Sequence, residues 1–413
     1  MRSADTTPSG HPGLRPFVVA PDGLLASVLL AFLTTAGIFY VNIMPALVAG
    51  LRDALHFSAR DAGIIASCNV YGAALGAFTA AFLAVRVPWR RTSCVALVVL
   101  IAIDAVSALL GSVGPLMVAR FLHGVTGGLL VGIGVMVIAR TRVPDRGFGM
   151  LLIVQFALGG LGIMLLPTLV SSFGTGALFA ALVAMSAVTL CLLPFIPDYA
   201  ARGETVAPLE SSGHRMQVRV LLAAALVAMF LFQAFCMSTS AFSIGMGVAF
   251  GLTPGFTAVT LGVGTWAGLL GAGAVVVFGL KFGRFWPLLA GVLVGVGCNV
   301  VLVFYGGVPW VWAVANACGS VVWAFVLPYL YGLVSAFDPA GRTAPWAGFF
   351  SKLGLATGPA LGALALAETH YVRLLWWAAL VGLISALLAL APARRLDASV
   401  SRGLKQHEAN AAT

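Results

Sequence analysis

The chain has 413 residues, of which 61% are hydrophobic and only 9% are charged, and its mean hydropathy is +1.04. Soluble domains carry about 25% charged and about 45–50% apolar residues, so this composition excludes a soluble enzyme, a nucleic-acid-binding protein and a disordered chain. The formal net charge of +10 is assigned first to membrane topology, because basic residues orient membrane helices. The sequence therefore predicts a polytopic protein surrounded by a lipid bilayer, with no nucleic-acid partner.

Apolar stretches follow one another along the chain, and each is long enough to cross the roughly 30 Å hydrocarbon core as a helix. They lie at 24–50, 59–85, 92–113, 115–140, 147–173, 175–196, 218–248, 253–280, 285–306, 309–334, 343–367 and 371–392. A shift of the chain by 195 residues aligns 71–86 with 266–281, which supports an internal duplication. The sequence thus predicts an all-α membrane protein with twelve transmembrane helices in two pseudo-symmetric six-helix bundles.

The predicted bundles are 24–196 and 218–392, joined by a polar linker at 197–217 and flanked by polar tails at 1–23 and 393–413. Of the 23 Lys and Arg residues, 18 fall on segments that share the side of the two termini, and three fall on the opposite side (Arg52, Arg60 and Arg373). This split satisfies the positive-inside rule when both termini are cytoplasmic. We expect a monomer in the cytoplasmic (inner) membrane.

The six cysteines lie within or at the edges of apolar stretches, and their spacing is unlike that of metal ligands. The sequence also lacks a phosphate-binding loop, a nucleophile elbow and an acid pair with catalytic spacing. We therefore expect no disulfide, no metal, no other cofactor and no enzymatic activity.

Short polar motifs border the predicted spans. The stretch after the second span has Leu83 and Ala84 followed by three arginines, with Val85 at a position that is Asp in a known transporter signature. In the fourth span Arg120 precedes a series of glycines, and the turn before the fifth span reads Pro-Asp-Arg-Gly. Together with twelve spans in two halves, these motifs resemble the major facilitator superfamily. The resemblance implies a transporter whose conformational-motif residues are Arg86, Arg90, Arg91, Asp145 and Arg146.

Three charged residues lie well inside predicted spans: Asp104, Arg120 and Lys352. Charge in the membrane costs from about 2.5 kcal/mol upward, so each needs a partner or an aqueous cavity. Asp104 and Arg120 are equidistant from Ser112 in the loop of an antiparallel hairpin, which predicts matching depth. They form either a fixed internal ion pair or a proton-sensitive pair whose Arg is released to bind an anionic substrate.

Two further ionisable residues are candidates for proton coupling alongside Asp104. His123 lies one turn from Arg120 on the same helix face, as either a proton relay or a hydrogen-bonded neutral side chain. Asp61, at the outer start of the second span, is either an exposed helix-start acid or a coupling carboxylate.

Lys352 has no local counter-ion, because no Asp or Glu occurs in any predicted span of the second half. A Lys, unlike an Arg, readily loses its proton. We expect Lys352 to bind a substrate carboxylate or similar anion, or to carry a proton, with snorkelling to the membrane surface as the alternative. Other polar and aromatic candidates for a central cavity include Asn69 and Trp323. The predicted substrate-binding residues are Lys352, Arg120, Asn42, Gln155, Gln233, Trp266 and Asn316.

These features favour a secondary active transporter of a small organic molecule. Its binding site would open alternately to the two sides of the membrane, and its transport would be coupled to H⁺. An organic anion is the favoured substrate, because the predicted spans contain two basic residues, Arg120 and Lys352, against one acidic residue, Asp104. The first alternative is a proton-driven exporter of amphiphilic drugs, suggested by the Gly-Gly-x-Gly run at 159–162 in the fifth span. The second is a transporter-like receptor or assembly protein without flux.

Overall fold

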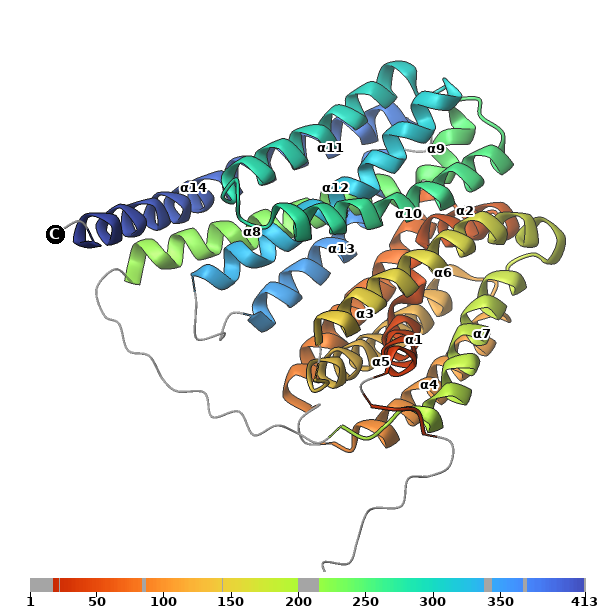
Figure 1. Cartoon of the computed structure of the whole chain (residues 1–413). Coiled ribbons are helices and arrows are strands. Elements are labelled where there is room, and N and C mark those ends of the chain that lie inside the picture. Colours follow the sequence, from red (N-terminus) through yellow and green to blue (C-terminus); the bar gives the residue numbers. More distant parts are fainter. Residues whose placement is uncertain are drawn as a thin grey trace, which may run out of the picture.

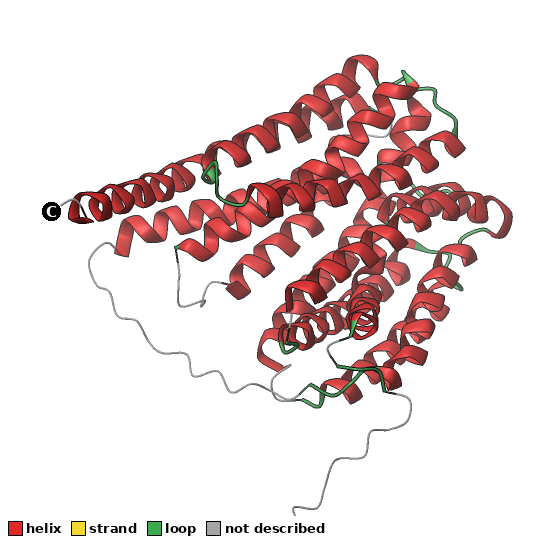
Figure 2. Ribbon diagram, in the orientation of Figure 1, coloured by secondary structure: helices red, strands yellow, loops and turns green. Residues whose placement is uncertain are grey.

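The computed structural model describes residues 18–21, 23–83, 87–142, 144–199, 215–337, 344–366 and 370–411, and it contains helices but no strand within these ranges. Figures 1 and 2 show two helical bundles. The first contains α1 (Leu24–Asn42), α2 (Met44–Leu55), α3 (Ala59–Leu83), α4 (Trp89–Ser107), α5 (Val113–Ala139), α6 (Pro144–Phe173), α7 (Gly176–Leu192) and the short η1 (Leu193–Phe195). The second contains α8 (Arg215–Ser240), α9 (Ser243–Ala249), α10 (Pro254–Phe278), α11 (Phe285–Tyr305), α12 (Pro309–Ala336), α13 (Ala344–Leu366) and α14 (Tyr371–Ala411).

These helices make twelve crossings, because the first span of each bundle is broken into two helices. Eleven helices of the described chain are long and apolar enough to cross a membrane. The remaining crossing, α4, has 19 residues and includes Arg90, Arg91 and Asp104, which shorten its apolar stretch. The predicted all-α, twelve-span architecture is confirmed.

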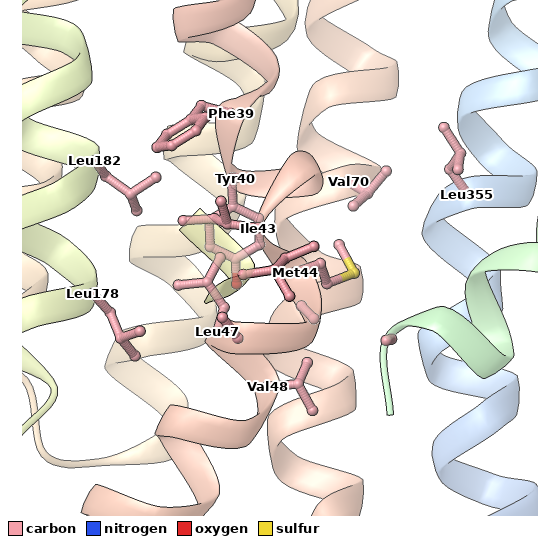
Figure 3. Packing of buried hydrophobic residues seen from close by; sticks show 14 of the residues in the cluster. Phe39, Tyr40, Ile43, Met44, Leu47, Val48, Val70, Leu178, Leu182 and Leu355 are labelled. Atoms are coloured by element: carbon pink, nitrogen blue, oxygen red, sulfur yellow. The ribbon is translucent and has the colours of Figure 1, made fainter. Parts of the chain in front are cut away.

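The break between α1 and α2 lies at Ile43, whose φ of −107° and ψ of 15° depart from helical values. Pro45 follows directly, and proline has no backbone N–H to continue the helical hydrogen bonding. Figure 3 shows the hydrophobic cluster around this break, in which Ile43, Met44 and Leu47 are almost fully buried. Leu355 joins the same cluster from α13 of the second bundle.

The break between α8 and α9 contains no proline. Instead, α8 ends in a Ser-Thr-Ser run whose hydroxyl groups donate to backbone carbonyls three residues earlier. Ser238 donates to Phe235 O (2.9 Å) and Thr239 to Cys236 O (3.2 Å). Such local bonds compete with the helical pattern, and Phe242 N accordingly donates to Thr239 O at 3.2 Å. The predicted continuous span at 218–248 is therefore interrupted.

The two bundles come together near α2 and α9 and diverge towards the ends at which α8 and α13 begin (Figure 1). At the α2 end, Arg52 Nη1 donates to the Tyr371 hydroxyl of α14 at 2.7 Å. Along the interface, α3 lies against α13, where the Tyr71 hydroxyl shares a hydrogen bond of 3.0 Å with Thr357 Oγ1. The halves are thus joined at one end and along this helix pair.

The last helix extends beyond the predicted span at 371–392, so the residues predicted as a tail from 393 continue α14 as far as Ala411. Asp397 anchors this extension by accepting backbone hydrogen bonds from Arg284 N (2.9 Å) and Phe285 N (3.0 Å) at the start of α11. The Arg394 guanidinium lies 4.3 Å from the centre of the Phe285 ring. Pro392 lies inside the helix without ending it.

Candidate functional site

A cavity of about 1030 Å³ lies between the bundles. It is lined by α1, α2, α5 and α6 of the first bundle and by α8 to α13 of the second. This volume suits a small organic molecule, since binding pockets commonly measure about 300–1,000 Å³. Most of the wall is apolar or aromatic, and Lys352 is the single charged side chain among the described residues that line it.

Lys352 lies on α13, eight residues after the helix begins, or about 12 Å along its axis. Within the described part of the chain, its ammonium group makes no hydrogen bond or ion pair. A charged group away from water is costly unless it is paired. An anion entering the cavity would supply the missing partner.

Beside Lys352, a chain of hydrogen bonds connects three helices of the second bundle. Gln233, which is buried on α8, donates through Nε2 to Ser351 Oγ (2.8 Å) and accepts through Oε1 from the Trp323 indole N–H (2.8 Å). The Trp323 ring meets the Phe156 ring of the first bundle edge-on, with the centroids 6.1 Å apart. The Gln233 amide is therefore held in place by protein groups on both sides.

Two asparagines of the cavity wall carry buried amide nitrogens without a hydrogen-bond partner among the described residues. They are Asn42 at the end of α1 and Asn299 on α11, one from each bundle. An unpaired buried donor costs about 1–3 kcal/mol, which an acceptor on a bound molecule would recover. Asn299 was not predicted, although a lone amide in the apolar stretch at 285–306 was an available signal.

The other predicted cavity residues divide between wall and packing. Gln155 and Asn316 line the cavity, as do Asn42 and Gln233, and the Asn316 amide donates to Trp312 O on its own helix at 2.8 Å. Trp266 is absent from the wall, because its indole N–H donates to Ala157 O of α6 at 3.3 Å where α6 and α10 meet.

Arg120 also lies away from the cavity, in a buried cluster of the first bundle. Its Nη1 is 2.8 Å from Asp104 Oδ1, and the two side chains are 1% and 0% exposed. Arg120 Nη2 also donates to Ser107 Oγ, and the guanidinium lies between the rings of Phe179 (5.1 Å) and Tyr40 (5.8 Å). The predicted Asp104–Arg120 pair is observed, and its arginine is placed with the acid rather than in the cavity wall.

His123 joins this cluster on the other side of the carboxylate. Its Nε2 is 3.3 Å from Asp104 Oδ2, and its Nδ1 is 2.8 Å from the Asn69 amide nitrogen, which also donates to Arg120 O at 3.1 Å. Because that amide is a donor, His123 Nδ1 accepts and Nε2 is the ring nitrogen that carries the proton. Neither His123 nor Asn69 lines the cavity.

A family model described as Major Facilitator Superfamily matches residues 25–351. The chain belongs to the Major Facilitator Superfamily. It is a multi-pass membrane transporter and not an enzyme.

Solved structures of other transporters share this fold at low sequence identity. The nucleoside transporter NupG is similar with a TM-score of 0.72 and 11% identity over 89% of this chain and 98% of that one. A D-xylose-proton symporter gives a TM-score of 0.66 with 15% identity, over 89% and 96%. A bacterial homologue of the human lysosomal transporter Spinster gives 0.66 with 14% identity, over 92% and 98%. No curated protein matches the sequence.

Of the predicted conformational-motif residues, Arg90 has clear partners within the first bundle. Its guanidinium donates to the carbonyls of Leu193 (3.1 Å) and Ile196, and it lies 5.1 Å from the centre of the Trp89 ring. Arg90 thus connects the start of α4 to η1 and the residue that follows it. Arg91 and Arg146 are exposed, whereas Arg86 and the Asp145 side chain lie outside the described residues.

Asp61, a predicted coupling acid, lies in the first turn of α3 and not in the cavity wall. Ser58 Oγ donates to its carboxylate at 2.6 Å and accepts from Asp61 N at 3.0 Å. This reciprocal pattern stabilises the start of the helix.

Proposed function

We propose that this transporter is a secondary active carrier of a small organic anion, coupled to H⁺, that alternates access to the cavity between its bundles. The observation that carries the proposal is Lys352, the only charged side chain of the described cavity wall, which lacks a partner among the described residues. Its ammonium group attracts a carboxylate or a similar anion and repels a cation. The apolar remainder of the wall accommodates an organic body.

The two alternatives have weaker support. A drug exporter for cationic amphiphiles needs a negative group in the cavity, and the described wall contains no Asp or Glu. A receptor without flux needs no wide chamber between two bundles, whereas alternating access requires one. The broken first span of each bundle lies against this chamber, where a change of helix direction can open or close it.

Reconstituted vesicles test the proposal directly. With a pH gradient imposed, we expect uptake of an organic acid such as benzoate to exceed uptake without the gradient. Lys352→Gln should abolish uptake, and Lys352→Arg should keep partial binding because the charge remains. If Lys352 instead carries the proton, the Arg variant binds benzoate but loses the response to the gradient. Gradient-driven efflux of a cationic dye with no benzoate transport would favour the drug-exporter alternative.

We further propose that both termini face the cytoplasm. The α10–α11 turn then lies inside and the α4–α5 connection outside, and each offers an exposed position, Lys281 and Leu109. In a variant without native cysteines, Lys281→Cys and Leu109→Cys should react with an impermeant thiol reagent from opposite sides. Reaction of both from the same side would contradict this orientation.

A further inference from the structure

The polar groups of the cavity lie at two depths. Helices α1, α11 and α13 all begin at the end where the bundles diverge, so positions along them can be compared. Lys352 lies about 12 Å along α13, whereas Asn299 lies about 21 Å along α11 and Asn42 about 27 Å along α1. Both amides therefore lie further along their helices from this end than Lys352 lies along α13.

The deep end of the cavity offers unpaired donors and no described charge. Within the part of the chain that the structure describes, the amide nitrogens of Asn42 and Asn299 have no hydrogen-bond partner. The neighbouring Ser243 hydroxyl donates to Ser240 O at 2.8 Å, and the Asn316 amide donates within its own helix. Since buried polar groups are normally hydrogen-bonded, the two free donors point to an acceptor carried by the bound molecule.

Aromatic and apolar side chains make up most of the rest of the cavity wall. Phe156 and Trp323 meet edge-on, and Phe235 lies close to Gly295, one turn before Asn299. Aromatic walls favour flat apolar bodies, which they contact through ring faces and edges. The cavity thus combines one cationic group, a mostly apolar wall and two amide donors without partners among the described residues.

We infer that the transported molecule is an elongated organic acid with one anionic group, an apolar body and an uncharged hydrogen-bond acceptor at its far end. Lys352 binds the anion, while Asn42 and Asn299 bind the acceptor from the two bundles. The inference rests on the proposed function, because it assumes that Lys352 meets the substrate. A second carboxylate at the deep end would meet neutral amides and no cation of the described wall, so a dicarboxylate binds less well.

Three rigid probes of one length test this arrangement: 4′-acetylbiphenyl-4-carboxylate, its 4′-isopropyl analogue and biphenyl-4,4′-dicarboxylate. The acetyl and isopropyl groups have a similar size, but only acetyl accepts a hydrogen bond. We expect the purified full-length protein to bind the acetyl probe about tenfold more tightly than the isopropyl probe, and the dicarboxylate more weakly than the acetyl probe.

Variants assign the preference to the amides. Asn299→Leu and Asn42→Leu should each reduce the ratio of acetyl-probe affinity to isopropyl-probe affinity, since neither amide nitrogen has a hydrogen-bond partner among the described residues and each is free to serve the acetyl oxygen. Thr265→Val is the matched control, because this wall hydroxyl already donates to Leu261 O at 2.9 Å. It should leave the preference intact.

The results separate this inference from the proposed function. Equal affinities for the acetyl and isopropyl probes, or tightest binding of the dicarboxylate, would overturn the inference, and neither result depends on a variant that folds. The proposed function would survive that outcome if both acids lose their binding in Lys352→Gln. Binding of all the acids unchanged in Lys352→Gln would overturn both.

Discussion

Removal of one partner from the Asp104–Arg120 pair should be more damaging than removal of both. The pair is at most 1% exposed, and its two charges lie 2.8 Å apart. Loss of one partner from a buried pair typically costs about 3–5 kcal/mol, because the remaining charge keeps its desolvation cost, whereas replacement of both is often nearly neutral. We therefore expect Asp104→Asn to lower the free energy of unfolding by about 3–5 kcal/mol.

The contacts also predict which single variant is worse. In Arg120→Gln, the Asp104 carboxylate keeps His123 as a polar neighbour, with Nε2 3.3 Å from Oδ2. In Asp104→Asn, the guanidinium keeps Ser107 and two aromatic rings but no negative charge. Arg120→Gln should therefore cost less than Asp104→Asn.

Unfolding in mixed detergent micelles, followed by tryptophan fluorescence, measures these differences. The double variant Asp104→Asn/Arg120→Gln should recover at least about 2 kcal/mol relative to the sum of the single losses, as expected for residues in direct contact. Strictly additive losses would mean that the two charges do not interact, and the account of the cluster would be refuted.

Three other contacts give further predictions. Gly124→Ala should lower the folded yield severalfold, because the added Cβ meets the backbone of α3. Gly114→Ala on the same helix meets nothing within 4 Å and should be tolerated, so equal yields of the two variants would contradict the close α3–α5 packing. Tyr371→Phe removes the hydroxyl that accepts from Arg52 and should increase thiol labelling of the cavity from the α2 side. Unchanged labelling would show that the Arg52–Tyr371 hydrogen bond does not hold the α2 end closed. Asp397→Ala should lower the free energy of unfolding by about 1 kcal/mol, because it removes the cap of α11. Asp397→Asn should cost less because it keeps an oxygen acceptor, and an equal loss in both variants would contradict capping.

The sequence predicted the crossings well because apolar length is a direct requirement of the bilayer. It also predicted the Asp104–Arg120 contact, since equal distance from a hairpin loop brings two residues to one depth. The α1–α2 break had a visible signal in Pro45. The α8–α9 break depends on which hydroxyl groups donate to backbone carbonyls. The sequence alone does not specify these bonds, because they form only in the folded helix.

Contacts between helices distant in sequence were harder to predict. Asn69 binds His123 only because α3 lies against α5, and Trp266 faces α6 instead of the cavity for the same kind of reason. Helical periodicity shows which residues share one face of a helix, but it does not show which other helix packs against that face. The extension of α14 past Pro392 depends on Asp397 reaching α11, which is likewise a tertiary contact.

Direct binding of an organic acid to the purified transporter tests the central claim that Lys352 is the anion site. Titration calorimetry with benzoate should give a similar affinity for the unmodified protein and for Lys281→Gln, a matched change at an exposed lysine. Lys352→Gln should bind about tenfold more weakly or not at all, since a buried charge partner has been removed. Unchanged benzoate affinity in Lys352→Gln would contradict the account.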